Sequence, residues 1–446
     1  MVRKIKMKNH LVLREFFKYT SLNILGMAGI SCYILADTFF VAKGLGNNGL
    51  TALNLAIPLY SFMYGIGIML GTGGGAMYSI LRSQGKEKES NSVFSLTVLI
   101  GAIVSVFLMI SGIFFHDKLA ILVGADSQVM DMTSTYLMVL WTAAPLFIFN
   151  NIIIMFTHND NAPHIAMIGM ITGSLMNVLL DYIFIFPLNM GMFGAVLATA
   201  MSPGISLLFM SVHFIRRKNN FHLNFSLPIF RYTKKVLSLG FTSFVNEVSS
   251  GIIIMVFNLI LISISGNTAV AAYGIIANVS IVIIAVFTGI AQGTQPLVSK
   301  YYGLENQKNI RKLFRYGFIY VTLLSAVIYS LMCIFSDGIT SIFNSENNIE
   351  LNQIAVYGIH IYFTGIAFAG LNILFSVLLS AQDKAKYATI ISVARGIAVI
   401  LPVTLILSYF WGITGLWLSF PVSEGIVLVI SIISLILTNK NQSTNI

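Results

Sequence analysis

Long runs of apolar residues follow one another along almost the whole of this 446-residue chain. A helix of about 20 apolar residues crosses the hydrocarbon core of a bilayer, whereas a soluble protein could not cover so many such runs. Hydrophobic residues make up 57% of the chain and charged residues only 9%. The sequence therefore predicts an all-α integral membrane protein.

The apolar runs divide into twelve predicted transmembrane helices. Their borders lie near residues 16–41, 49–80, 92–114, 131–157, 164–187, 191–215, 235–263, 269–300, 311–336, 351–381, 387–409 and 412–438. Because the number is even, both termini are expected on the same side of the membrane.

Lysine and arginine residues indicate which side that is, because cytoplasmic loops carry an excess of them. Of the 26 Lys and Arg residues, Lys43 and Lys118 fall in loops opposite the termini and Arg395 falls inside a span; the others lie on the side of the termini. We therefore expect a plasma (inner) membrane protein with both termini in the cytoplasm. This topology, with attraction to lipid headgroups, accounts for the net charge of +10, so no nucleic-acid partner is expected.

The two halves of the chain repeat each other. Gly71–Gly85 and Gly289–Gly303 both begin with a glycine-rich stretch and end with a basic residue and a further glycine, at matching spacing. Gly191–Ala195 has an echo in Trp411–Leu416. Six helices followed by six more in the same orientation predict two pseudo-symmetric bundles around a central cleft.

The predicted division places residues 1–220 in an N-terminal six-helix bundle and residues 221–446 in a C-terminal one. The basic stretch 216–235 is the expected cytoplasmic linker. Two bundles that rock about a cleft have the geometry of alternating access. We expect the chain to act as a monomer on small molecules.

Transport against a gradient needs an energy source, and no GxxxxGK[ST] nucleotide motif occurs in the chain. The glycine cluster at 71–75 lies in an apolar run, where small residues usually allow close helix packing. An ion gradient remains, and one charge crossing 100 mV is worth about 2.3 kcal/mol. The two isolated cysteines, Cys32 and Cys333, predict neither a disulfide nor a metal site. We expect no cofactor, with H⁺ or Na⁺ as the coupling ion.

Four of the 16 acidic residues, Asp37, Asp181, Glu247 and Glu424, lie inside predicted spans. A carboxylate near the bilayer centre costs roughly 2.5–3.5 kcal/mol, so it is kept mainly where it faces a cavity, a partner or a transported ion. Glu424 has a candidate partner in Arg395, at similar depth in the adjacent span, and pairing is the cheapest way to bury either. We expect a structural ion pair; the alternative is that Glu424 binds a cation or a substrate.

Motifs along nearly the whole chain resemble, in order, those of the multidrug and toxic compound extrusion (MATE) transporters. The matching stretches are Ala36–Val41 with Leu45, Gly46 and Pro58, Gly71–Gly85, Asn177–Ile185 with Gly191, Gly194, Ala195, Ala198 and Thr199, Gly240 and Phe241 with Glu247, and Gly293–Pro296 with Tyr302 and Gly303. The resemblance implies export of amphipathic, usually cationic compounds in exchange for H⁺ or Na⁺.

The resemblance also implies a cation or proton site in the N-terminal bundle, formed by Tyr33, Asp37, Asn177, Asp181 and Thr199. The sequence agrees in part, because each acid lies one helical turn after a polar partner and so shares its face. Two carboxylates in one cavity cannot easily both be charged, which favours a shared proton or a bound cation. The alternative is that these residues only link helices.

Glu247 lies near mid-membrane, about twelve residues into its predicted span at 1.5 Å per residue. It resembles an acidic residue that some MATE proteins carry in the C-terminal bundle or in contact with drug. The span 351–381 has no acid that could complete a Na⁺ site there. Glu247 is therefore expected to contact cationic substrate; the alternative is a hydrogen bond between packed helices.

Other functions and sites fit the sequence less well. A flippase for a lipid-linked precursor has a similar plan, but would require more cavity arginines and usually extra helices. An enzyme or receptor would require a nucleophile–base cluster or a large extramembrane domain, and neither is visible in the sequence. His158, Asp160 and His164 are close in sequence, and a solvated loop is favoured there over a metal site.

Overall fold

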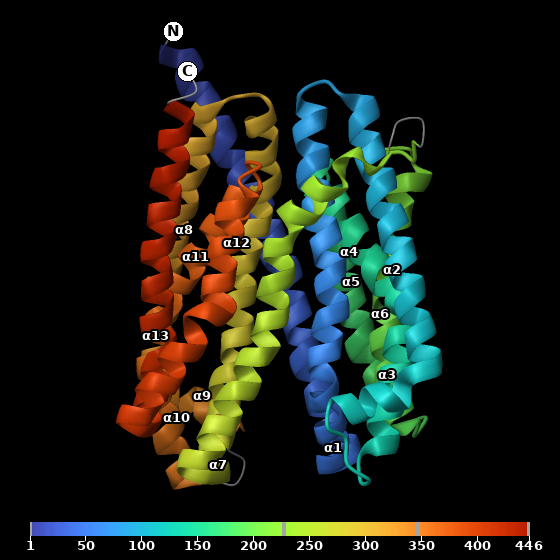
Figure 1. Ribbon diagram of the computed structural model, residues 1–446, viewed down its shortest axis with the longest axis vertical. Helices are drawn as coiled ribbons and strands as arrows, with labels where there is room; N and C mark the ends of the chain where they lie inside the picture. The colour runs from blue at the N-terminus through green and yellow to red at the C-terminus, as the bar shows by residue number, and fades with distance from the viewer. Residues whose placement is uncertain (1, 225–228, 344–347, 444–446) are drawn as a thin grey trace.

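The computed structural model describes residues 2–224, 229–343 and 348–443, and within these ranges it is helical with no strand. Two helical bundles stand side by side, one formed mainly by the first half of the chain and the other by the second (Figure 1). The prediction of an all-α membrane fold with two bundles is confirmed.

The helices follow one another through short connections. They are α1 (Val2–Ser83), α2 (Glu87–Leu122), α3 (Met130–Thr142), α4 (Ala144–Asn159), α5 (Pro163–Ile185), α6 (Gly191–Ile215), α7 (Thr233–Gly303), α8 (Gln307–Ile334), α9 (Ser336–Phe343), α10 (Ile349–Tyr362), α11 (Ile366–Ser380), α12 (Ala385–Val393) and α13 (Ile400–Ser443), with the 3₁₀ turns η1 (Ile229–Tyr232) and η2 (Phe363–Gly365) and the π-helical turn η3 (Ala394–Ala398).

Within the described ranges, ten helices are long and apolar enough to cross a membrane, and α3 with α4 forms an eleventh span with a bend. One of the ten, Ala385–Thr438, has 54 residues and is interrupted at Gly412, so it accounts for two predicted spans. The predicted number of twelve is consistent with this arrangement.

Glycines in the left-handed region separate spans that lie on one continuous ribbon. Gly46 (φ 68°) divides α1, and Gly412 (φ 55°) divides α13. Gly191, which the repeat aligns with Gly412, also has positive φ (61°), at the start of α6. A side chain with a Cβ would be strained at such a dihedral angle. The sequence similarity between the two halves at Gly191 and Gly412 therefore reflects a turn that both halves require.

Three predicted spans are less regular than the sequence suggests. The span 131–157 bends by 49° between α3 and α4, where Pro145 in the first turn of α4 has no N–H to continue the α3 ladder. The span 351–381 contains the 3₁₀ turn η2, and the span 387–409 contains the π-helical turn η3, which includes Arg395.

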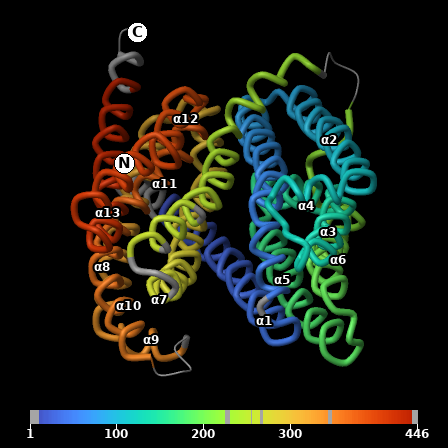
Figure 2. The backbone as a smooth tube through the Cα atoms, turned by 60° about the horizontal axis from the view of Figure 1, so that its bottom comes forward, coloured from blue at the N-terminus to red at the C-terminus, as the bar shows by residue number. Residues whose placement is uncertain are grey.

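The first parts of α1 and α7 lean onto the opposite bundle. Val12 and Phe16 belong to the hydrophobic core of the second half, whereas Val236 and Leu239 belong to the core of the first half. Figure 2 shows α1 running obliquely between the bundles. The predicted division between residues 220 and 221 therefore separates two halves of the sequence, whereas the starts of α1 and α7 each pack in the core of the opposite half.

The two bundles are sealed together towards one end. A Cβ on Gly73 would overlap the carbonyl oxygen of Val236, and one on Gly240 would overlap that of Met69, so these helix backbones touch. The side chain of Gln295 donates to the carbonyl of Thr72 (3.2 Å) across the same interface. We call the contacts around Gly73 and Gly240 the glycine seam.

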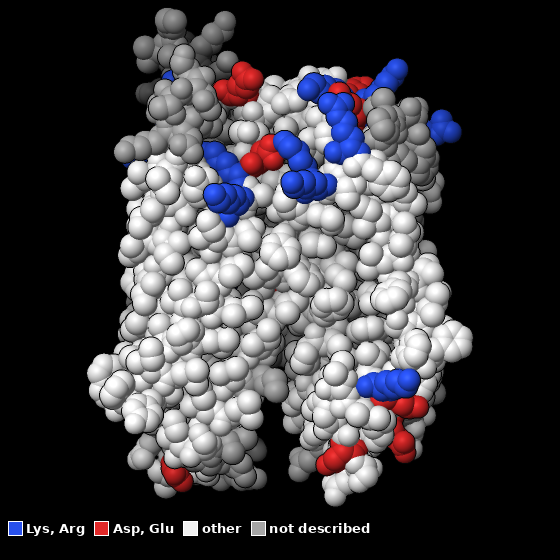
Figure 3. Space-filling model, in the orientation of Figure 1, with Lys and Arg blue, Asp and Glu red and all other residues white. Residues whose placement is uncertain are grey.

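The ends of the molecule differ in charge and in shape. The start of α1 and the end of α13 lie at the same end of the molecule, where lysine and arginine side chains gather (Figures 1 and 3). We call it the basic end. At the other end, the surface is hollowed between the two bundles (Figure 3). The central cleft is therefore open at the end away from the termini.

Candidate functional site

The acids of the N-terminal bundle lie together, as the resemblance implies. Asp37 is on the first span of α1 and Asp181 on α5; both are buried, with Asp181 fully covered. The two carboxyl groups interact electrostatically. Asn177, one turn before Asp181, donates to Thr199 Oγ1 of α6 at 3.5 Å and is also fully buried. Three helices thus bring four of the five predicted residues into one polar site.

Oxygen atoms at this site lack hydrogen-bond donors. Within the described residues, both carboxylate oxygens of Asp181, Oδ1 of Asp37 and Oδ1 of Asn177 are buried and have no hydrogen-bond partner. Buried polar groups are nearly always satisfied, so an exception calls for an explanation. Oxygen ligands from carboxylate and amide groups suit a hard cation, and a carboxylate can take up a proton instead. This cluster has the chemistry of a proton or Na⁺ site.

Tyrosines extend the site, and sequence analysis identified only one of them. Tyr33, one turn before Asp37, lies with its hydroxyl 3.3 Å from that of Tyr60 on the second span of α1. Tyr60 stacks on Tyr64, with ring centroids 5.5 Å apart. Tyr136 of α3 is buried and interacts with both acids and with Thr199. The one-turn spacing of Tyr60 and Tyr64 could have indicated a polar face.

Glu247 of α7 approaches this site from the other half of the chain. It is partly buried and interacts electrostatically with Tyr33, Tyr60 and Tyr64. Its helix packs on Gly65, where a Cβ would lie 3.6 Å from the Cβ of Glu247. Tyr33 is therefore close enough to interact with both the acid pair and Glu247.

Arg395 and Glu424 form a separate network in the C-terminal bundle. Arg395 Nε donates to Glu424 Oε1 at 2.7 Å, and the Glu424 side chain is only 5% exposed. Asn372 of α11 donates to Glu424 Oε2 (2.8 Å) and accepts from Ser431 (2.8 Å). These two partners are not evident from the sequence, because their residue types are common in apolar helices. Both carboxylate oxygens of Glu424 are satisfied, unlike those of Asp181.

Loss of one partner of this network is expected to destabilise the protein. Arg395→Ala leaves Glu424 buried without its counter-charge and should lower the free energy of unfolding by about 3–5 kcal/mol, while Arg395→Ala with Glu424→Ala should recover much of the loss. Melting temperatures of the purified variants in one detergent check this. Glu424→Gln could instead give a stable protein that has lost transport. If a further change of Arg395 did not rescue transport, Glu424 would belong to the transport site.

The polar stretch after α4 is not the solvated loop that the sequence favours. His158 lies on α4 and is buried, and Asp160 is 5% exposed. Asp160 accepts hydrogen bonds from the Tyr78 hydroxyl (2.8 Å) and from the backbone N–H of Asn220 (2.7 Å). The prediction of a solvated loop is wrong for His158, which lies in a buried part of α4, and for Asp160, which the end of α1 and the chain after α6 contact; His164, at the start of α5, is exposed. Among the described residues, no group of three or more His, Cys, Asp or Glu could hold a metal ion.

Comparison with known proteins agrees with this architecture. Multidrug export protein MepA of Staphylococcus saprophyticus is 28% identical over 398 residues, which cover 88% of this chain and 87% of that protein. MepA of Staphylococcus aureus strain MSSA476 is 26% identical with the same coverage.

Solved structures share the fold. A multidrug resistance MATE family transporter in an outward-facing conformation has a TM-score of 0.90 at 19% identity, over 96% of each chain. A mutant of the Vibrio cholerae MATE transporter VcmN has a TM-score of 0.88 at 21% identity, over 97% of this chain and 98% of that one. The MatE family model matches residues 23–183 and 242–410, well over half of the sequence. This protein therefore belongs to the MatE (MATE) family of membrane transporters and is not an enzyme.

Proposed function

We propose that this protein is a secondary active multidrug efflux transporter, which exports amphipathic, mostly cationic compounds in exchange for H⁺ or Na⁺. The observation that carries the proposal is Asp181, fully buried with two carboxylate oxygens that no described residue satisfies. A side chain so costly to bury is expected to be neutralised by an ion that binds and leaves. The MepA relatives, which are named as multidrug export proteins, support the substrate class.

Tyr33, Asp37, Asn177, Asp181 and Thr199 are proposed to bind the coupling ion, with Tyr136 beside them. Binding of H⁺ or Na⁺ would neutralise the acid pair and remove the repulsion between its carboxylates. Tyr33 and Tyr60 connect this pair to the face near Glu247. A change of charge at the pair can therefore act on a substrate held beside the tyrosines.

Glu247 is proposed to hold the cationic group of the substrate. Its carboxylate stands near Tyr60 and Tyr64, and aromatic faces attract cations as well as apolar rings. Acidic side chains near the cleft favour the binding of cationic compounds over that of the anionic headgroup of a lipid-linked precursor. Arg395, which an anion could otherwise use, is engaged by Glu424.

Alternating access is proposed to occur by rocking of the N-terminal and C-terminal bundles, residues 1–220 and 221–446. The glycine seam closes the cleft towards the basic end, and the cleft is open at the other end (Figure 3). Following the charge distribution, we place the basic end and both termini in the cytoplasm of a plasma-membrane monomer. The structure then corresponds to an outward-open state, and return requires the seam to separate.

Substitution of Glu247 tests the substrate site. Glu247→Gln should raise the KM for a fluorescent lipophilic cation by roughly tenfold or more, because a hydrogen-bonded charge is lost, and should leave a neutral analogue little affected. Transport into inverted vesicles measures both constants. Glu350→Gln, the same change at an exposed position at the start of α10, is the matched control. Equal losses for cation and neutral analogue would contradict the role of Glu247.

Expression in a pump-deficient cell tests the function as a whole. Cells that carry the protein should tolerate several lipophilic cations at concentrations that stop the growth of control cells, and should accumulate less of a fluorescent one. Unchanged tolerance and accumulation, with the protein present in the membrane, would contradict the proposed function.

A further inference from the structure

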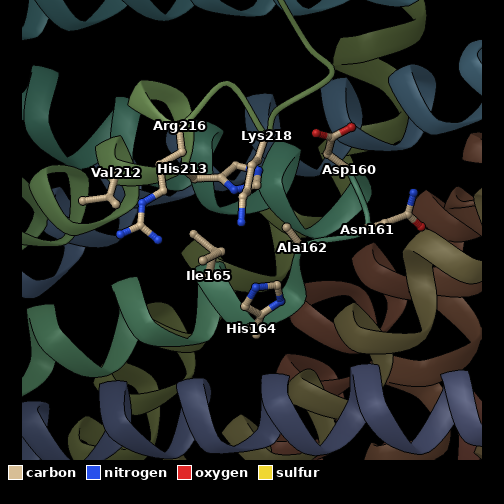
Figure 4. Close-up of a pocket in the computed structure, with 9 residues that line it drawn as sticks. All are labelled: Asp160, Asn161, Ala162, His164, Ile165, Val212, His213, Arg216 and Lys218. Atoms are coloured by element: carbon tan, nitrogen blue, oxygen red, sulfur yellow. The ribbon is translucent and has the colours of Figure 1, made fainter.

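A cavity of about 510 Å³ lies at the basic end of the N-terminal bundle, away from the acid pair. Its polar lining consists of Asp160, Asn161, His164, His213, Arg216 and Lys218. Figure 4 shows Arg216, His213 and Lys218 directed from the end of α6 towards the start of α5, where His164 lies. The transport mechanism proposed above uses none of these side chains.

The lining has an excess of positive charge. Arg216 and Lys218 are exposed, and neither is in an ion pair within the described part of the chain. Lys18 and Lys218 both interact electrostatically with His164. Asp160 is the one carboxylate in the lining, and its two oxygens already accept hydrogen bonds from Tyr78 and Asn220. The cations therefore remain available for an anion.

His213 provides a buried group without a partner. The residue is only 7% exposed, and its Nε2 atom has no hydrogen-bond partner among the described residues, although its ring lines the cavity. A buried polar atom without a partner calls for an explanation, and a hydrogen bond to a bound ligand supplies one. On the opposite wall, α5 begins after Ala162, whose side chain cannot cap the helix. The uncapped N-terminus of this 23-residue helix adds partial positive charge.

The mouth of the cavity is continuous with surface that faces lipid. On α6, Leu208 is 70% exposed and Ile215 is 77% exposed, and on α5 Ile168 is 42% exposed. Ile165 and Val212 carry this apolar surface into the cavity wall. A lipid whose anionic headgroup lies among these cations could therefore place an acyl chain along α5 and α6. Basic pockets between transmembrane helices on the cytoplasmic side are suited to lipid headgroups.

We propose that this cavity is a binding site for a phosphate group, contributed by the headgroup of an anionic phospholipid. Arg216 and Lys218 pair with the phosphate charge, and His213 Nε2 makes a hydrogen bond to a phosphate oxygen. Because Asn220, at the start of the linker to the second bundle, contacts Asp160 in the same wall, the bound lipid fastens the linker to the N-terminal bundle.

The test compares lipid retention by charge-matched variants. Full-length protein in phosphatidylcholine nanodiscs, with or without phosphatidylglycerol, is released and examined by native mass spectrometry. Arg216→Gln with Lys218→Gln should weaken retention of phosphatidylglycerol by roughly 25-fold, from about fivefold for each lost charge. Arg217→Gln with Lys234→Gln removes two exposed charges outside the cavity lining and should change retention little. Equal retention in the two double variants would overturn the proposal.

Two further arms identify the source of the phosphate and separate binding from stability. Soluble glycerol phosphate, added to phosphatidylcholine nanodiscs, should not raise the melting temperature as phosphatidylglycerol does; an equal rise would assign the site to a free phosphate compound rather than a lipid. His213→Gln should keep the wild-type melting temperature in phosphatidylcholine but lose most of the increase from phosphatidylglycerol. An undiminished increase in this variant would contradict the role of His213.

Discussion

Asp181→Asn is expected to abolish drug export while the protein still folds and inserts. The side chain is fully buried, so removing its charge should lower the cost of insertion, roughly 2.5–3.5 kcal/mol for a carboxylate at mid-membrane, rather than raise it. The amide nitrogen of asparagine cannot replace the second carboxylate oxygen of Asp181. The variant should therefore neither take up a proton nor bind a cation. Resistance of pump-deficient cells should fall to the level of cells without the protein, at wild-type amounts in the membrane.

The same experiment tests whether the two acids act as one site. Asp37→Asn should be equally inactive, and the double variant no worse than either single one, because residues that form a unit are non-additive. Asp131→Asn, an exposed position at the start of α3 in the same bundle, is the matched control and should keep export. Full resistance in Asp181→Asn cells, or partial losses that add, would contradict a single coupling site.

Gly240→Ala is expected to stop transport by preventing closure at the basic end. The added Cβ would overlap the carbonyl oxygen of Met69, and a helix backbone cannot move aside as a flexible side chain can. The closed seam should therefore lose stability relative to a state in which the bundles separate there. Export should fall at least tenfold. Ser243, whose hydroxyl accepts a hydrogen bond from Thr72 (3.2 Å), also lies in the seam. A cysteine at this position, in protein without Cys32 and Cys333, should react much faster with a membrane-impermeant reagent applied from the basic end.

Gly274→Ala, on the same helix α7, is the control for this effect. A Cβ at Gly274 would meet nothing within 4 Å, and alanine is favoured over glycine in helices by about 1 kcal/mol. This variant should transport normally and leave the labelling rate at Ser243→Cys unchanged. If Gly240→Ala also labels and transports normally, the seam is not a gate that opens and closes.

Hydropathy predicts the number and order of the spans, because apolar length is set by bilayer thickness and is visible in any window of the sequence. Hydropathy shows neither the bend at Pro145, which comes from the missing N–H of a proline, nor the π-helical turn at Arg395, which depends on local backbone packing. The oblique course of α1 is also hidden. Only tertiary contacts show that Phe16, near the start of α1, packs in the core of the opposite half.

Residues of the candidate site can be predicted from the sequence where they lie in motifs of the family. Residues that join the site from other helices are harder to predict. Asp37 and Asp181 stand out because charge is rare in these spans. Tyr136 and Asn372 do not, because such residues occur throughout the apolar runs and acquire a role only from the helix that faces them. Glu247 illustrates the same limit: its depth follows from the sequence, but its position beside Tyr60 and Tyr64 does not.

Coupling of export to an ion gradient by the buried acid pair can be measured in reconstituted vesicles. Purified protein is placed in proteoliposomes loaded with a fluorescent cation, and a pH gradient or a Na⁺ gradient is imposed, one at a time. One gradient is expected to drive movement of the dye by wild-type protein, and neither is expected to do so for Asp181→Asn. Gradient-driven movement of the same size in Asp181→Asn vesicles would contradict coupling by the acid pair.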